Sequence, residues 1–254
     1  MNTKVALVTG ASSGIGEATA LKLNSLGYTV YAAARRVERM SALTHSGIHI
    51  ISMDVTDDAS MQNAIQKIIE NSGRIDVLVN NAGYGSYGAV EDVPLKEAQA
   101  QFDVNVFGAV RLIQLALPHM RSQGTGNIIN ITSMGGKLHT PLGAWYHGTK
   151  FALEAISDCL RLELQSFGIH VVVVEPGGIK TEWADIAASK LQQVSGHGIY
   201  ANQAHAMAKS MIGESSRKRQ SPPELIADTI AKAVTSKCPK TRYVVGFGAK
   251  HYYS

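Results

Sequence analysis

Two side chains that can move a proton lie four residues apart in the second half of the chain, Tyr146 and Lys150. The surrounding stretch is typical of a helix, and residues i and i+4 share one helix face, so the Lys150 ammonium can act on the phenol. A free tyrosine has a pKa of about 10, which a nearby cation lowers because it favours the phenolate. The spacing therefore predicts that this pair exchanges a proton with a substrate oxygen. Such pairs also occur by chance on solvated helices, so the rest of the chain must support the interpretation.

A hydroxyl and an amide lie upstream of this pair. Ser133 stands thirteen residues before Tyr146, where its hydroxyl could hydrogen-bond the same substrate oxygen, although alone it could simply cap the end of a strand. Asn105 lies inside a helical pattern over 102–117 and by itself is unremarkable. A hydroxyl donor, a phenol and a cation can together align a carbonyl group, polarise its oxygen and supply a proton. The remaining requirement is a hydride donor, and a nicotinamide would supply it.

The beginning of the chain has a pattern suited to a dinucleotide. The apolar run 4–9 predicts a strand, glycines follow at Gly10, Gly14 and Gly16, and apolar residues recur at helical spacing over 17–26. Such a turn lets the backbone approach a pyrophosphate, and the helix N-terminus offers free N–H groups and its positive dipole end. The spacing is G-x-x-x-G-x-G, not the common G-x-G-x-x-G, and alone it could be only a turn. Its position between strand and helix predicts a dinucleotide site.

The end of the second predicted strand indicates which dinucleotide binds. An acidic residue about 20 residues after the glycine turn would accept hydrogen bonds from the ribose 2′-OH of NAD. This chain has Ala34, Arg35 and Arg36 there. A guanidinium pairs with a 2′-phosphate in a bidentate manner, so the sequence predicts NADP(H), with Arg35 as the main contact and Ser12 or Ser13 as helpers. The alternative is that the two arginines are only a solvated strand end.

Strand-like runs alternate with helical patterns along most of the chain. Beyond the first strand, runs rich in β-branched residues predict strands at 28–34, 48–53, 75–80, 127–132, 169–175 and 242–245. Continuous apolar runs such as 171–174 are typical of strands covered on both faces, as in a parallel sheet. The sequence therefore predicts one α/β domain over 1–254 that binds NADP(H). Its fold is a Rossmann-type doubly wound parallel sheet with helices on both faces.

One segment departs from this alternation. Residues 182–220 predict two short helices with a break at 196–198, and the segment is too long for a simple connection. An insertion beyond the C-terminal end of a sheet strand is well placed to cover the ligand crevice, so we expect a substrate lid. The basic run 217–219 predicts a solvated loop before a helix capped at Ser221.

Composition limits the remaining classes. A chain of 254 residues that is 45% hydrophobic can bury a sizeable core, and its net charge of +4 is too small to indicate nucleic acid. The sequence has no Cys/His cluster of the kind that would predict a metal site. Cys159 lies among apolar residues, so buried, reduced thiols are expected rather than a disulfide with Cys238. No run is long enough to span a bilayer and no signal-peptide pattern is present, so a soluble cytoplasmic protein is expected.

Several independent motifs occur in order along the chain. With them the chain resembles the short-chain dehydrogenase/reductase (SDR) family over about residues 4–181, whereas the resemblance is weak beyond residue 182. The motifs are Thr9–Gly16, Asp54–Val55, Asn80–Gly83, Asn105, Ser133, Tyr146-x-x-x-Lys150 and Pro176–Gly177.

The resemblance implies a catalytic role for four matching residues. Tyr146 would be the general acid in carbonyl reduction, or the base in alcohol oxidation. Lys150 would hold the nicotinamide ribose hydroxyls and lower the pKa of Tyr146. Ser133 would hydrogen-bond the substrate oxygen, and Asn105 would anchor a water in a proton relay. None of these four positions departs from the family pattern.

The resemblance also implies the cofactor contacts. The three glycines of the turn would line the pyrophosphate, Asp54 would hydrogen-bond the adenine, and Thr181 would touch the nicotinamide carboxamide. Residues 80–83 would close over the adenine ribose and stabilise the central sheet. The predicted cofactor-binding residues are Gly10, Ser12, Ser13, Gly14, Ile15, Gly16, Arg35, Asp54, Val55, Asn81, Ala82, Gly83, Tyr146, Lys150, Pro176, Gly177, Ile179 and Thr181.

The substrate and the oligomeric state are predicted more coarsely. The expected pocket edge is mostly apolar and lacks a charged group for a carboxylate or phosphate, which favours a steroid-like, retinoid, fatty or aromatic ketone. The helix at 151–167 is apolar on more than one side, and related proteins commonly form dimers or tetramers through it, so a homodimer or homotetramer is expected. The expected pocket-edge residues are Met134, Leu138, Leu142, Trp183, Ile186 and Met207.

Three classes of function remain open. The first is an NADP(H)-dependent carbonyl reductase or alcohol dehydrogenase. The second is a non-catalytic protein that senses a dinucleotide on the same scaffold, and such a protein would lack the Tyr146 or Lys150 that this chain has. The third is another SDR enzyme, such as a 3-oxoacyl reductase, or an epimerase or dehydratase, which usually needs a larger C-terminal substrate domain.

Overall fold

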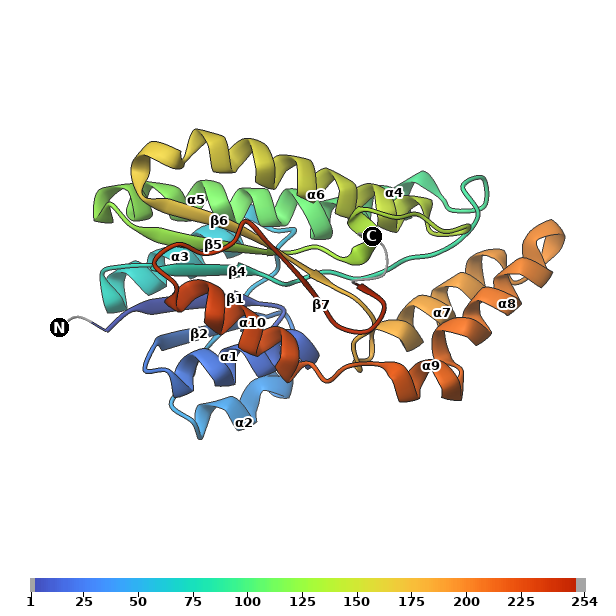
Figure 1. The fold of residues 1–254 in the computed structure, drawn as a ribbon, viewed down its shortest axis with the longest axis horizontal. Coiled ribbons are helices and arrows are strands. Elements are labelled where there is room, and N and C mark those ends of the chain that lie inside the picture. Colours follow the sequence, from blue (N-terminus) through green and yellow to red (C-terminus); the bar gives the residue numbers. More distant parts are fainter. Residues whose placement is uncertain (1–2, 250–254) are drawn as a thin grey trace.

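Parallel strands form the centre of the molecule. The computed structural model describes residues 3–249, so the predicted domain limits at 1 and 254 lie outside the described part. Within it, a seven-stranded parallel sheet has the order β3-β2-β1-β4-β5-β6-β7 (Figure 1). The strands are β1 (Val5–Thr9), β2 (Thr29–Ala34), β3 (His49–Ser52), β4 (Val77–Asn80), β5 (Gly126–Ile131), β6 (Ile169–Pro176) and β7 (Arg242–Val245). Each predicted strand is present, with limits within two residues of the prediction, which confirms the fold class.

Helices cover both faces of this sheet (Figure 1). One apolar core lies between the sheet and α1 (Gly14–Ser25), α2 (Ser41–Thr44) and α10 (Glu224–Thr235). The other lies between the sheet and α3 (Asp58–Ser72), α5 (Gly108–Gln123) and α6 (Ala144–Glu163). Alternate residues of β6 enter the two cores, Val172 the first and Val171 the second. A strand buried on both faces needs apolar residues at successive positions, which explains the continuous valine run.

The order of the strands reverses between β1 and β4. The chain first runs outward from β1 through β2 to β3, then returns to β4 and continues to β7 on the other side. Parallel strands end at a common edge, and ligands of such sheets bind outside these carboxyl ends, where the order reverses. The segments that follow β1, β4, β5 and β6 carry most of the predicted site residues, so the topology brings them to one edge.

The helix predicted at 102–117 is part of a longer helical run. Here α4 (Leu95–Phe102) continues through a π-helical turn (Asp103–Phe107) into α5. A π-helical turn inserts an extra residue into an α-helix and is frequent at functional sites. Asn105 lies in this turn, which the sequence pattern did not reveal.

The segment 182–220 contains three helices rather than two. They are α7 (Trp183–Ser195), α8 (Ala201–Ile212) and α9 (Glu214–Arg219), with a 3₁₀ turn at Gly198–Tyr200 at the predicted break. The loop predicted at 217–219 is therefore wrong. These three cations lie in the last turn of α9, where the helix dipole favours positive charge. The predicted cap at Ser221 is also wrong, because this residue pairs with Ile179 and α10 begins at Glu224.

Both cysteines are free, as predicted, but they are exposed rather than buried. Cys159 lies on the outward side of α6, away from the apolar residues that pack on the sheet. Across residues 3–249, no helix combines the length and the apolar character that crossing a membrane requires.

Candidate active site

The turn after β1 is shaped by close backbone contacts. Gly10 and Gly14 have φ angles of +64° and +58°, in the left-handed region that favours glycine. A Cβ on Gly10 would lie 2.9 Å from the Cα of Ala82, and one on Gly14 would lie 2.9 Å from the Cγ2 of Thr181. The turn is therefore held between the segments that follow β4 and β6. Residues of this turn, including Gly10 and Gly14, line a cavity at the same edge of the sheet.

Gly16 has a different role from the other two glycines. It is buried in α1 and is not among the residues that line the cavity. A Cβ there would lie 2.3 Å from the backbone oxygen of Gly10. Gly16 allows the helix to pack closely on the turn, and any larger side chain would push the two apart, whereas its expected contact with a pyrophosphate stays a prediction.

The Thr9 side chain ties β1 to the segment that follows β4. The Thr9 hydroxyl accepts hydrogen bonds from the backbone N–H groups of Asn81 and Ala82, at 3.0 and 2.9 Å. In return, the Asn81 side chain donates to the backbone oxygen of Thr9 at 2.9 Å. On the other side of β4, Asn80 Nδ2 donates to Asn130 Oδ1 of the neighbouring strand β5 at 2.9 Å. These partly or fully buried bonds support the expectation that residues 80–83 stabilise the central sheet.

The end of β2 presents positive charge to the same edge. The Arg35 side chain is 73% exposed, and its Nη1 lies 3.9 Å from Asp54 Oδ2. The other oxygen of Asp54 accepts from the backbone N–H and the hydroxyl of Thr56. Arg35 is therefore loosely held and can turn toward an added anion, whereas Asp54 is fixed by its own loop.

Most predicted cofactor and catalytic residues line one cavity of about 970 Å³. Two of the predicted site residues are exceptions, Gly16 and Asn105. Among the expected pocket-edge residues only Leu142 is absent from the lining, and it is buried in an apolar cluster with Tyr87 and Tyr146. The predicted residues that do line the cavity are Gly10, Ser12, Ser13, Gly14, Ile15, Arg35, Asp54, Val55, Asn81, Ala82, Gly83, Ser133, Tyr146, Lys150, Pro176, Gly177, Ile179 and Thr181.

Ser133, Tyr146 and Lys150 meet at one end of this cavity. Ser133 follows β5 and begins a 3₁₀ turn, where its Oγ accepts from the backbone N–H of Gly135 at 3.0 Å. Tyr146 and Lys150 lie on the buried face of α6. Lys150 Nζ donates to the backbone oxygen of Ile131 at 2.9 Å and lies 6.0 Å from the centre of the Tyr146 ring.

Burial controls the proton affinity of both side chains. It raises the pKa of Tyr146 to about 12, and the adjacent Ser133 side chain acts in the opposite direction. It lowers the pKa of Lys150 to about 8, against the attraction of Glu154. The expected lowering of the Tyr146 pKa by Lys150 is thus wrong for this structure. The loss of hydration outweighs the lysine charge, whose hydrogen bond is made to Ile131.

Asn105 lies behind the cavity wall. Its Oδ1 accepts from the backbone N–H of Tyr84 at 3.0 Å, and its Nδ2 donates to the Tyr84 oxygen at 2.9 Å. Nδ2 also donates to the Thr149 hydroxyl at 3.1 Å, and this hydroxyl donates to the backbone oxygen of Tyr146 at 2.7 Å. The amide thus fixes the loop after β4 against the helix that carries Tyr146. Thr149 was missed, because its place before Lys150 is its only sequence signal.

His147 is a packing residue, held by hydrogen bonds on both ring nitrogens. Its Nε2 accepts from the backbone N–H of Thr140 at 3.2 Å, which leaves Nδ1 to donate to the Gly135 oxygen at 2.9 Å. Burial lowers the pKa of this imidazole, so the neutral form is favoured. The side chain holds the segment 135–140 along one wall of the cavity.

Aromatic side chains cover the candidate phenol. The ring centre of Trp183, the first residue of α7, lies 5.1 Å from that of Tyr146, and the Tyr87 ring centre lies 5.5 Å away. Near the cofactor end, Arg39 makes two hydrogen bonds to the Glu182 carboxylate, at 2.7 and 3.1 Å. The segment 182–220 is therefore attached at its start to both ends of the cavity.

A model of the short chain dehydrogenase family matches residues 4–192. The chain belongs to the short-chain dehydrogenase/reductase family. Three relatives match it over almost their whole length. They are a probable short-chain type dehydrogenase/reductase, VdlC, of Helicobacter pylori, a 3-ketodihydrosphingosine reductase of Bacteroides thetaiotaomicron, and an NADPH-dependent 3-dehydrocapnine reductase of Ornithobacterium rhinotracheale. They are 35%, 35% and 34% identical, over 95%, 97% and 95% of this SDR chain and 88%, 89% and 88% of their own.

Solved structures show the same fold. A short-chain dehydrogenase from Streptomyces avermitilis has a TM-score of 0.87 and 33% identity, over 99% of this chain and 91% of its own. A metagenomic short-chain oxidoreductase in complex with NADP has a TM-score of 0.75 and 29% identity, over 95% and 96%. An NAD⁺-bound xylitol dehydrogenase has a TM-score of 0.83 and 27% identity, over 97% and 99%. As an SDR, the protein is an oxidoreductase that binds a nicotinamide dinucleotide and a small-molecule substrate.

Proposed function

We propose that this SDR is an NADP(H)-dependent enzyme that transfers a hydride between nicotinamide and a ketone or secondary alcohol with a large apolar part. One observation carries the proposal. A single cavity is lined at one end by Arg35 and the glycine turn, and at the other by Ser133, Tyr146 and Lys150. A dinucleotide site that opens onto a phenol, a hydroxyl and a buried ammonium provides both the hydride and the proton that carbonyl reduction needs.

The residues fit a nicotinamide dinucleotide. Gly10 and Gly14 make a turn that a Cβ would fill, which is what close approach to a pyrophosphate requires. Ser12, Ser13 and Ile15 would lie along the same group, Asp54 and Val55 beside the adenine, and residues 81–83 beside its ribose. Pro176, Gly177, Ile179 and Thr181 would border the nicotinamide. When bound, the nicotinamide supplies or accepts the hydride.

The proton step can be assigned to this chain's own residues. Because its pKa is raised to about 12, Tyr146 carries its proton at neutral pH and can donate it to a carbonyl oxygen held by Ser133. The new alcohol O–H bond forms as the phenol O–H bond breaks. The phenolate that remains lies on the helix face that carries the Lys150 ammonium. In alcohol oxidation the same proton returns to Tyr146. Asn105 would hold the loop and the water on which proton supply depends.

NADP(H) is favoured over NAD(H) by charge. Exposed Arg35 lines the cavity, with Arg36 beside it, where an NAD site would have a carboxylate. One relative is named as NADPH-dependent, and one structural neighbour was solved with NADP. The xylitol dehydrogenase, which binds NAD⁺, shows that the fold also accepts the other cofactor. The arginine pair is therefore the basis of this part of the proposal.

The substrate end of the cavity favours an apolar ketone. Its walls include Met134, Leu138, Trp183, Ile186 and Met207. Two relatives are named as reductases of 3-ketodihydrosphingosine and of 3-dehydrocapnine. A fatty ketone is therefore the first choice, ahead of steroid-like, retinoid and aromatic ketones. Residues 182–220 would act as the lid over this end.

We also infer a cytoplasmic homodimer or homotetramer. The outward face of α6 and its neighbours expose large apolar side chains, including Phe151, Leu162 and Phe167. The Leu162 side chain is 75% exposed, and a second copy would cover it. Two free cysteines are compatible with a reducing compartment. Sedimentation of the purified protein tests the oligomeric state.

The test is consumption of NADPH with a ketone panel, followed at 340 nm. The panel holds 3-ketodihydrosphingosine, a steroid ketone, an aromatic ketone and a 3-oxoacyl thioester. We expect turnover of the fatty ketone, with Tyr146→Phe as the matched inactive control. Binding of NADPH without turnover of any ketone would favour the sensing protein, and turnover of the thioester alone would favour a 3-oxoacyl reductase.

A further inference from the structure

A buried carboxylate lies on the same face of α6 as the two proposed proton-transfer residues. Glu154 follows Lys150 by four residues and Tyr146 by eight, so the three side chains form one stripe along the helix. It is 3% exposed, and neither proton transfer nor cofactor binding as proposed uses it. The turn after Ser133 is packed against it. A Cβ on Gly136 would lie 3.0 Å from Glu154 Cγ and 3.2 Å from the Lys150 oxygen.

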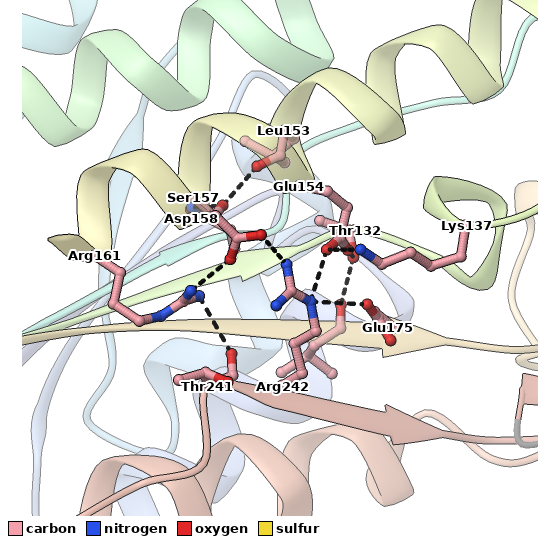
Figure 2. Close-up of polar contacts among 12 residues, drawn as sticks. Thr132, Lys137, Leu153, Glu154, Ser157, Asp158, Arg161, Glu175, Thr241 and Arg242 are labelled. Atoms are coloured by element: carbon pink, nitrogen blue, oxygen red, sulfur yellow. Dashed lines mark hydrogen bonds and ion pairs between the residues drawn. The ribbon is translucent and has the colours of Figure 1, made fainter. Parts of the chain in front are cut away.

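Figure 2 shows the groups that surround this carboxylate. Glu154 Oε1 accepts from the Thr132 hydroxyl at 2.6 Å. Oε2 lies 3.1 Å from Lys137 Nζ and 3.0 Å from Arg242 Nε. Thr132 immediately precedes Ser133, Lys137 ends the turn that Ser133 begins, and Arg242 starts β7. One carboxylate therefore connects α6 to the end of β5, to the Ser133 turn and to the last strand.

The cluster that contains Glu154 holds equal numbers of positive and negative groups without Lys150. Arg242 also contacts the Glu175 carboxylate at 3.4 Å and the Asp158 carboxylate at 2.5 Å, and Asp158 in turn pairs with Arg161. Together with Lys137 and Glu154, these groups are three cations and three carboxylates. Lys150 is an additional, buried positive charge beside them. A neighbouring group must therefore offset the free-energy cost of keeping the Lys150 ammonium charged in this buried position.

Glu154 is placed to supply that offset. Side chains four residues apart on a helix have Cβ atoms about 5–6 Å apart, whereas Asp158 is a full turn further away. Burial lowers the pKa of Lys150, and the Glu154 charge acts in the opposite direction. Lys137 and Arg242 carry the same charge as Lys150 and act against this effect, but both are paired with the Glu154 carboxylate. The net effect of the cluster on Lys150 therefore depends on Glu154.

We propose that Glu154 is a positioning residue that keeps Lys150 in its charged form from one helical turn below, without touching substrate or cofactor. Its meaning for catalysis rests on the proposed function, but its electrostatic effect does not. A charged Lys150 stabilises the phenolate that remains when Tyr146 has given up its proton. Lys150 loses its own proton as the pH rises through its pKa of about 8. Without Glu154 this loss occurs at lower pH, and reduction fails earlier.

The test measures the proton on Lys150 directly, in the protein without cofactor. Lysine is labelled with ¹³C at Cε, the Lys150 signal is identified by its loss in Lys150→Arg, and its shift is followed from pH 6 to 11. We expect the midpoint to fall by roughly one unit or more in Glu154→Gln, because one opposite charge at this range moves a pKa by about 1–3 units. The amide keeps the shape and the acceptor for Thr132. An unchanged midpoint overturns the proposal.

Asp158→Asn is the matched control. It removes a carboxylate from the same helix and the same arginine, but one turn further from Lys150. We expect its midpoint to equal that of the wild type. If the cluster only ties β7 to α6, both variants lower the melting temperature and neither moves the midpoint, which also overturns the proposal. A shift of the same size in both variants would mean that the whole cluster acts and not Glu154.

A second variant keeps the test decisive if Glu154→Gln does not fold. The Lys137 side chain is 34% exposed, so Lys137→Gln should be tolerated. It removes a cation that repels Lys150 and partly neutralises Glu154, so the midpoint must move upward. An unchanged or lower midpoint there contradicts the proposal.

Kinetics then connect the effect to the reaction. With a ketone that the wild type reduces, the basic limb of kcat for NADPH oxidation should move to lower pH in Glu154→Gln and stay in place in Asp158→Asn. If the wild type reduces no ketone, the proposed function fails, yet the titration still decides the role of Glu154. A shifted Lys150 midpoint with an unshifted basic limb would show that Lys150 does not govern the rate, and would overturn the catalytic part.

Discussion

The dinucleotide end of the cavity and the segment 182–220 are built on different principles. Around the glycine turn, contacts are made by backbone atoms and buried polar groups, such as Thr9 with Asn81 and Gly14 with Thr181. The segment 182–220 is instead attached mainly through side chains: the exposed ion pair Arg39–Glu182, small and apolar side chains, and polar contacts such as Lys190–Glu97 at 2.7 Å and Ser195 Oγ, which accepts from the Ala89 N–H at 2.9 Å. A backbone-built site accepts few substitutions, whereas an apolar surface accepts many of similar volume. We therefore propose that cofactor binding depends on the first region and substrate choice on the second.

The largest expected effect comes from removing one oxygen at the junction of the two regions. Tyr146→Phe keeps a ring that packs against Tyr87 and Trp183 but removes the proposed proton donor. We expect ketone reduction to slow by about 10²–10⁴-fold for every substrate, the usual contribution of general acid catalysis. NADPH affinity, measured by fluorescence titration, should stay near the wild-type value. Retention of more than about a tenth of the rate would mean that the proton comes from elsewhere.

A smaller effect is expected at the other end of the same cavity. Arg35→Asp replaces a cation with a carboxylate that repels a 2′-phosphate and accepts from a ribose 2′-OH. Because Arg36 can turn in as a substitute, Arg36→Ala is added. A charge-assisted hydrogen bond contributes about 1.5–3 kcal/mol, so NADPH selectivity should fall by one to two orders of magnitude. The readout is kcat/KM for NADPH and NADH with one fixed ketone. A double variant that still prefers NADPH, or a wild type that prefers NADH, contradicts the role of Arg35.

The backbone-built region is also the one that the sequence describes well. Glycines at a tight turn and continuous apolar strands leave clear patterns in the sequence, so glycine spacing located Gly10 and Gly14, and the apolar runs located the strands of the described sheet. The burial of Cys159 was predicted wrongly, because an apolar stretch of helix does not reveal which side faces the sheet. The π-helical turn at Asn105 was missed, because no residue type specifies an extra residue in a helix.

Electrostatics and long-range ion pairs were the least predictable from sequence. The i, i+4 spacing suggested that Lys150 lowers the Tyr146 pKa, but the sign depends on how much water each group loses, which only the packed structure shows. Arg242 reaches Glu154 from 88 residues away, and no local pattern connects them. Glu154 did leave a signal: a carboxylate that continues the Tyr146–Lys150 stripe on a buried helix face is costly unless cations surround it.

A change in the second region should act on some substrates and not on others. Ile186 lines the cavity and is 44% exposed, so Ile186→Ser removes about half of the contact that a buried isoleucine would make. We expect KM for a long-chain ketone to rise by roughly fivefold, with KM for NADPH and for a short ketone unchanged. Ile199→Ser is the control, because that residue is 85% exposed and does not line the cavity. An equal loss for long and short ketones would break the distinction between the regions.

The smallest effect should come from the ion pair that joins the two regions. Arg39→Met removes the two hydrogen bonds to Glu182. Both side chains are partly exposed, so kcat/KM for NADPH should change by less than about fivefold. The Arg39 hydrogen bond lowers the pKa of Glu182, so the pair stabilises the fold only while that carboxylate is ionised. Any difference in melting temperature should therefore be present at neutral pH and vanish as the pH falls through the folded-state pKa of Glu182.

Lys218→Met separates this effect from the loss of any surface charge. Its ion pair with Glu214 lies within α9, is more exposed, and joins no two regions. The two variants should behave alike if the segment 182–220 is only loosely attached to the dinucleotide site. A loss of NADPH kcat/KM well beyond fivefold in Arg39→Met, with Lys218→Met unaffected, would place the ion pair within the cofactor site. The start of α7 would then be part of the dinucleotide site, because an exposed ion pair there would affect the use of NADPH as strongly as buried backbone contacts do elsewhere.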